Sequence, residues 1–134
     1  MDLGFQGGYG TDGSVNAMSL QPDGKVIIAG SFSSFNNSNR TGIARLNTTG
    51  SLDGSFVVTN TPDGLIYAMA LQPDGSVVLG GAFGNLGLNP RARVARVTST
   101  GALDLSFDPG SGPNDLVTAV ALQPNGKVVI GGAF

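Results

Sequence analysis

One segment of the sequence occurs three times at a constant spacing. The residues Leu20–Gly24 read L-Q-P-D-G, and an apolar run follows them as far as Phe32. The segment returns at Leu71 and, with Asn125 in place of the Asp, at Leu122, so each copy lies 51 residues after the previous one. A spacing this regular is typical of proteins built from a repeated supersecondary unit, and it constrains the fold more than any other feature of the chain.

Each copy of this segment predicts a β-hairpin. Pro22 fixes φ at the first central position of a type I turn, Asp23 suits the second, and Gly24 supplies the positive φ that a bulged hairpin needs. The flanking segments, Val15–Leu20 and 26–32, are rich in β-branched residues and have the length of strands. We therefore interpret the repeated Asp as a turn residue rather than as a metal ligand or a catalytic acid.

The repeat extends beyond the hairpin and divides the chain into units of residues 1–51, 52–102 and 103–134. A full repeat holds four segments of strand character, which in the first copy are residues 15–20, 25–32, 42–47 and 52–56. Four antiparallel strands in about 50 residues, with the most apolar strands first, is the pattern of a β-propeller blade. We expect residues 1–134 to form a single all-β repeat domain of about two and a half four-stranded blades. A β-trefoil is the alternative fold.

The composition supports a β fold and excludes several kinds of chemistry. The chain has 22 Gly and 7 Pro but no Glu, which suits short strands and tight turns better than helices. It has no Cys and no His, which excludes thiol chemistry, imidazole bases and zinc sites of His or Cys. No spacing of the Asp residues demands a metal, so we expect no metal site, no cofactor and no enzymatic activity.

Charge and hydropathy exclude two classes of partner. A net charge of −2 with only seven Lys and Arg residues gives no basic surface for nucleic acid. No apolar run reaches the roughly 18 residues that a membrane-spanning helix needs. We therefore expect neither nucleic acid nor membrane as a partner.

The motifs resemble a known family. The repeat combines L-D-x-S-F, then V-x-A-x-A-L-Q-P-D-G-K-(V/I)-x-x-G-G-x-F, then I-A-R-L-N-x-x-G-S-L-D. This combination resembles the delta-60 repeat family of bacterial β-propeller proteins over essentially the whole chain. The resemblance implies a propeller built of such repeats, often within long extracellular or envelope-associated proteins. It implies no defined activity, so it assigns no catalytic residue.

The phase of the repeat predicts assembly. The chain opens with a predicted fourth strand, Met1–Phe5, and its third unit holds only the first two strands. Closed propellers use about 4–8 blades, so the domain is either part of a longer propeller or completed by another chain. We favour a closed homo-oligomer, in which the hairpin 117–134 accepts Met1–Phe5 from another copy.

The links between strands are the expected place of function, because the strands themselves are committed to packing. Arg40 and Arg91 occupy equivalent positions just before the third strand of successive units. One hypothesis makes them ligand-binding residues, a ring of guanidiniums for acidic or sugar ligands. The alternative is a structural bridge to an Asp or a backbone carbonyl. Arg45 and Arg96 are likewise equivalent, as are Asp53 and Asp104, and we expect these residues to pair within or between blades in a structural role.

Three functional hypotheses follow. The leading hypothesis is a non-enzymatic β-propeller scaffold that presents loops for protein or glycan binding and assembles through blade faces. The second is a propeller hydrolase or lyase that uses Asp residues in a pocket. The third is a purely structural or engineered repeat module without a ligand. A pocket that brings two Asp carboxylates to one substrate bond would favour the enzyme.

Overall fold

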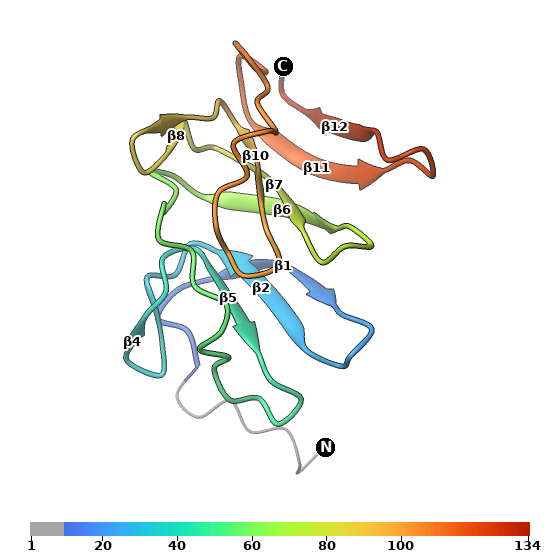
Figure 1. Cartoon of the computed structure of the whole chain (residues 1–134). Helices are drawn as coiled ribbons and strands as arrows, with labels where there is room; N and C mark the ends of the chain where they lie inside the picture. Colours follow the sequence, from blue (N-terminus) through green and yellow to red (C-terminus); the bar gives the residue numbers. More distant parts are fainter. Residues whose placement is uncertain (1–9) are drawn as a thin grey trace.

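The computed structural model describes residues 10–134, and over these residues all regular structure is β. Two three-stranded antiparallel sheets and one hairpin are stacked in layers, one for each repeat unit (Figure 1). We call them blades 1, 2 and 3. Blade 1 contains β1 (Val15–Leu20), β2 (Val26–Gly30) and β5 (Ile43–Leu46); blade 2 contains β6 (Ile66–Leu71), β7 (Val77–Gly81) and β10 (Val94–Val97); blade 3 contains β11 (Val117–Leu122) and β12 (Val128–Gly132).

The predicted hairpin turn is confirmed in all three blades. The N–H of Gly24 donates to the carbonyl of Gln21 at 2.9 Å, and Gly24 has a φ of 87°. The equivalent glycines, Gly75 and Gly126, have φ values of 88° and 82°. Asp23 accepts a hydrogen bond from the N–H of Lys25 at 3.0 Å, as a turn residue would. The three turns lie on one side of the stack in Figure 1.

The main core lies between blades 1 and 2. It combines Ile27, Ala29 and Ile43 of blade 1 with the opposing face of blade 2, and its members are buried. The partners of these residues are Phe56, Val58, Ile66, Val77, Leu79, Phe83, Leu86, Ala95, Val97 and Leu103. A second core on the opposite face of blade 1 contains Ile28, Phe32, Phe35, Ala44 and Leu46. β2 therefore buries both of its faces, as its uninterrupted apolar sequence predicts.

The expected fourth strand is not formed as a strand. Leu52 makes a single antiparallel bridge to Leu46, and Leu103 makes the equivalent bridge to Val97. The chain then turns, because Asp53 Oδ1 accepts the N–H of Ser55 at 2.9 Å and its hydroxyl at 2.6 Å. The described blades thus have three strands and one bridge rather than four strands. The predicted strand Met1–Phe5 lies outside the described residues.

The links between the second and third strands, for which the sequence predicts loops, contain two short β-hairpins. β3 (Ser34–Phe35) pairs with β4 (Ser38–Asn39), and β8 (Asn85–Leu86) pairs with β9 (Asn89–Pro90). These short hairpins lie on the side of the stack opposite the repeated turns, where β4 and β8 are labelled in Figure 1. Asn36 and Asn37 turn the first one at positive φ, 48° and 64°. The links between the second and third strands therefore form regular hydrogen-bonded hairpins.

Candidate functional site

Two carboxylates fix the short hairpins to the link that precedes each blade. Asp12 accepts the N–H groups of Ser33 and Ser34 at 2.8 and 2.9 Å and the Ser33 hydroxyl at 2.6 Å. Asp63 binds Gly84 and Asn85 in the same way, at 2.8 to 3.0 Å. Hydrogen bonds from Ser33 and Ser34 hold the pKa of Asp12 well below its usual range. Both carboxylates are ionised loop anchors, which are poorly suited to act as acids.

The two arginines of the hypothetical ligand ring also lie on this side of the blades. Arg40 donates from Nη1 to the carbonyl of Asn39 at 2.7 Å, and Arg91 donates from Nη1 to the carbonyl of Pro90 at 2.7 Å. The side chain of Arg91 is 7% exposed and its Nη1 lies 3.9 Å from Asp108 Oδ2. The Nε atoms of both arginines are buried without a hydrogen-bond partner among the described residues. Each guanidinium is thus folded back onto the carbonyl of the residue before it. A ring of arginines that binds ligands stays a prediction.

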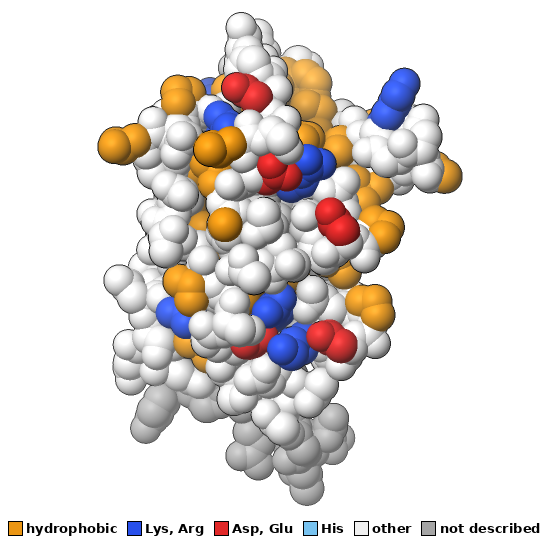
Figure 2. Space-filling model, viewed as in Figure 1, with side chains coloured by type: hydrophobic (Ala, Val, Ile, Leu, Met, Phe, Trp, Pro, Cys, Tyr) orange, Lys and Arg blue, Asp and Glu red, His pale blue; other side chains and the backbone are white. Residues whose placement is uncertain are grey.

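A second charged cluster recurs at the other end of the third strand. Arg45 Nε lies 2.8 Å from Asp53 Oδ2, and its guanidinium carbon lies 4.9 Å from the centre of the Phe56 ring. Arg96, Asp104 and Phe107 repeat this arrangement at 2.8 and 5.0 Å. Figure 2 shows acidic and basic side chains next to one another at two levels of the stack. The predicted structural pairing of these residues is confirmed.

Lys25 also belongs to this cluster, although its role was not predicted from the sequence. Its Nζ lies 2.9 Å from the same oxygen of Asp53 that Arg45 contacts. Burial raises the pKa of Asp53, but hydrogen bonds from Ser55, Lys25 and Arg45 outweigh that effect and hold the pKa well below its usual range. The sequence carries a signal for this lysine. A lysine directly follows the turn glycine in units one and three, and a serine does so in unit two.

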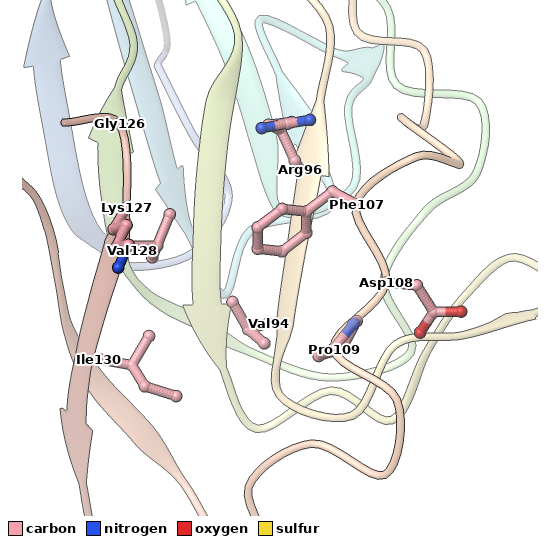
Figure 3. Close-up of a pocket in the computed structure, with 9 residues that line it drawn as sticks. All are labelled: Val94, Arg96, Phe107, Asp108, Pro109, Gly126, Lys127, Val128 and Ile130. Atoms are coloured by element: carbon pink, nitrogen blue, oxygen red, sulfur yellow. The ribbon is translucent and has the colours of Figure 1, made fainter.

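A groove of about 480 Å³ lies between blades 2 and 3. β10 and the segment after it form one wall, and β12 with its turn forms the other (Figure 3). Val128 and Ile130 point across the groove toward Val94 and Phe107. The remaining lining residues are Arg96, Asp108, Pro109, Gly126 and Lys127. The groove is mainly apolar, with one carboxylate and two cations at its margins, so it suits an apolar segment better than a small polar substrate.

The described part of the chain shows neither a metal centre nor a membrane span. Among residues 10–134 no three His, Cys, Asp or Glu side chains are grouped so that they could hold a metal ion. No helix over the same residues is long and apolar enough to cross a membrane. The oxygen-rich sites present, at Asp12 and Asp63, are occupied by N–H donors of the protein itself.

Comparison with known proteins identifies the repeat. The sequence model of a family described as "Domain of unknown function (DUF5122) beta-propeller" matches residues 21–56 and again residues 72–107. Each match begins in the hairpin turn of a unit and ends at the phenylalanine that stacks on its arginine, Phe56 or Phe107. No curated protein and no solved structure matches the chain. The family match favours the propeller over the trefoil.

Proposed function

The chain belongs to the DUF5122 β-propeller family, and on this premise we propose that it is a non-enzymatic scaffold. In this proposal it presents the short hairpins of one face for contacts with proteins or glycans and assembles through its blade faces. Blades of the delta-60 type belong to the same proposal, and so does a closed homo-oligomer in which the hairpin 117–134 accepts Met1–Phe5 from another copy. So does an extracellular or envelope location, which rests on the family resemblance alone.

One observation carries the scaffold proposal: the charged side chains that recur in each unit are bonded to the protein itself. Asp12 and Asp63 hold loops, while Asp53 and Asp104 hold arginines. The groove between blades 2 and 3 is lined by a single carboxylate, Asp108. Acid–base hydrolysis by carboxylates uses a pair of them around one bond, so this geometry supports binding rather than hydrolysis.

The short hairpins offer a surface that differs between units. The tip of the first hairpin is Asn36–Asn37, whereas the tip of the second is Gly87–Leu88. The Leu88 side chain is 99% exposed. Rigid strands that carry variable tips are the arrangement expected of a binding scaffold. Binding to an array of glycans and peptides tests this part: replacing Leu88 with Ser should remove a ligand that the parent protein binds, and a chain that binds nothing would favour the purely structural module.

Assembly through blade faces is supported by a comparison of equivalent residues. Val78 on blade 2 is fully buried beneath blade 3, whereas its equivalent on the outer face of blade 3, Val129, is 47% exposed. Met18 of blade 1 is 69% exposed. Apolar blade faces of this kind favour association. Light scattering tests it: we expect a mass above that of the 13.5 kDa chain, reduced by Val129→Asp, and a monomer at all concentrations would contradict it.

A further inference from the structure

Blades 1 and 2 leave a hollow of about 230 Å³ at the base of the first short hairpin. The two stems of that hairpin, residues 30–33 and 41–42, form one wall, and the link 62–65 that leads into blade 2 forms the other. We propose that this hollow binds one neutral pyranose ring, as a free sugar or as the terminal ring of a glycan. The inference rests on the proposed scaffold function and names the class of ligand for one place on its binding face.

The hollow has the size of a small ligand and its walls are fixed. Pockets for drug-sized ligands measure roughly 300–1,000 Å³, so this smaller hollow suits a single ring. The N–H of Gly30 donates to the carbonyl of Gly42 at 2.9 Å, and the N–H of Gly42 donates to the carbonyl of Phe32 at 2.8 Å. On the opposite wall, Asp63 is held by three hydrogen bonds from the second short hairpin. The site is therefore formed before a ligand arrives.

The charge of the lining disfavours acidic ligands. Asp63 is the single charged residue among the described residues that line the hollow. Hydrogen bonds from Asn85 hold its pKa below the ordinary value, so the carboxylate is ionised at neutral pH. Arg40 precedes Thr41 in sequence, but it does not line the hollow, and its Nη1 donates to the carbonyl of Asn39. A carboxylate or phosphate ligand would therefore meet a like charge, whereas a neutral ligand would not.

The donors and acceptors of the lining match hydroxyl groups. Asp63 Oδ1 accepts two N–H groups, but Oδ2 accepts one bond, from Asn85 Nδ2 at 2.8 Å, and so keeps an acceptor site. The Ser31 hydroxyl oxygen accepts the N–H of Ser14 at 3.2 Å, which leaves its own hydrogen to donate. The Thr41 hydroxyl can do both. A sugar hydroxyl also donates and accepts, whereas an ammonium group only donates and would leave the Ser31 hydrogen without an acceptor.

The rest of the lining is apolar and suits the C–H groups of a sugar ring. Pro62 and Leu65 stand on the wall opposite the hairpin stems, and the Leu65 side chain is 41% exposed. Phe32 lies buried beneath the hairpin stem. A mostly apolar hollow with a few polar groups that fix orientation is the usual form of a small-molecule site.

The hydroxyl groups of the hollow are not needed to build the fold around it. One repeat later, the hairpin stems have Ala82, Gly84, Ala92 and Arg93 in place of Ser31, Ser33, Thr41 and Gly42. The backbone hydrogen bonds of the stems are nevertheless the same in both units, at 2.8 to 3.0 Å. Polar side chains that the backbone does not require, gathered around one hollow on a loop face, favour a role in binding.

Glycine at position 42 keeps the hollow open. A Cβ there would already contact Pro62 Cγ on the opposite wall, at 3.4 Å, so a longer side chain would occupy the hollow. At the equivalent position Arg93 carries such a side chain, and its Nε is buried. The next boundary between blades therefore lacks the hydroxyl groups and carries an arginine where this hollow opens. The proposed site is specific to the boundary between blades 1 and 2.

Nuclear magnetic resonance of the isotope-labelled full chain tests the site, with the methyl glycosides of glucose, galactose and mannose as probes. We expect at least one of them to shift the amide signals of residues 30–33, 41–42 and 62–65 saturably, with a dissociation constant on the order of 1 mM for a single ring. The double variant Ser31→Ala, Thr41→Ala carries the residues of the next unit, so it should fold, and it should weaken binding by about tenfold. Ser38→Ala lies on the same hairpin outside the hollow and is the matched control, which should leave the affinity unchanged.

Charge and the anomeric oxygen give further arms. The uronic acid of the sugar that binds should bind at least about fivefold more weakly, because Asp63 repels its carboxylate. The free sugar is compared with its methyl glycoside. Equal affinities support the terminal ring of a glycan as the ligand, and binding of the free sugar alone supports a free monosaccharide.

Three results would overturn the inference: no saturable shift at these residues with any of the sugars, unchanged affinity in the double variant, or tighter binding of the uronic acid or of glucosamine. The scaffold proposal fails separately. A glycan or peptide that binds at the hairpin tip and is lost with Leu88→Ser, while the signals around the hollow stay unshifted, would overturn the sugar site and leave the scaffold proposal standing.

Discussion

Arg45 donates from Nη1 to the carbonyl oxygen of Ser99 at 2.9 Å, across the boundary between two repeat units. The same guanidinium holds Asp53 and covers the ring of Phe56. Its side chain is 9% exposed, whereas that of the equivalent Arg96 is 24% exposed. The first copy of this Arg–Asp–Phe motif is therefore buried between blades 1 and 2. The second copy is partly exposed beside the groove.

This difference predicts unequal losses on removing the two arginines. Arg45→Ala leaves a buried carboxylate with a single lysine partner and should lower the free energy of unfolding by about 3 kcal/mol. Arg96→Ala removes a solvent-screened pair and should cost about 1 kcal/mol or less. Urea denaturation of the two variants measures both values. Equal losses in the free energy of unfolding would contradict the difference in burial between the two arginines.

The phenylalanines provide the same comparison without charge. Phe56 is fully buried between blades 1 and 2, while Phe107 is partly exposed in the groove. Phe56→Ala should cost about 4 kcal/mol through lost burial and the cavity it leaves. Phe107→Ala should cost clearly less, because water already reaches one side of the ring. Thermal melts can rank the two; a larger loss for Phe107 would contradict an open groove.

Arg93 occupies a backbone conformation that favours glycine. Its φ is 67°, and the equivalent residue of the preceding unit is Gly42, with a φ of 76°. Arg93→Gly should therefore raise the free energy of unfolding by about 0.5 to 1 kcal/mol. Gly42→Arg is the reverse change and should destabilise, since it places a side chain at a φ of 76°. Chemical denaturation of both variants checks the pair, and a stabilising Gly42→Arg would refute the assignment.

The carboxylates predict loss of stability in acid. Side-chain and backbone hydrogen bonds lower the pKa values of Asp12, Asp53, Asp63 and Asp104 below their ordinary value of 3.8. The unfolded chain therefore binds protons more readily than the folded chain, so the free energy of unfolding is fully present above pH 3.8 and falls as the pH drops below it. Asp53→Asn should flatten this dependence in urea titrations between pH 2 and pH 6. An unchanged slope would assign the acid sensitivity to other groups.

Much of the fold could be predicted from the sequence, because its strongest signals are local. The P-D-G turn, the β-branched strands and the buried faces of β2 follow from residue type and order at positions such as Gly24 and Ile27. The missing fourth strand has a physical reason too. Asp53 prefers to bind its own backbone at Ser55, which competes with strand pairing. The short hairpins carried their own signal in Asn36 and Asn37, which tolerate positive φ.

The groove depends on how the blades pack against one another, so no single residue of the sequence predicted it. Phe56 and Phe107 occupy equivalent sequence positions but differ in burial because one faces a completed blade and the other does not. Lys25 and Lys127 are also equivalent, and only the first has an acid within reach among the described residues. Such contrasts require the positions of blades 1, 2 and 3 in space.

Hydrogen exchange of two equivalent amides tests most directly whether blade 3 is an incomplete copy of blade 2. The N–H of Gly81 donates to Arg93 at 3.0 Å, so alternation along β7 directs the N–H of Leu79 toward β10 as well. The equivalent N–H of Ile130 faces the free edge of β12. We predict strong protection at Leu79 and fast exchange at Ile130. Equal protection of both amides in the isolated chain would contradict the open edge.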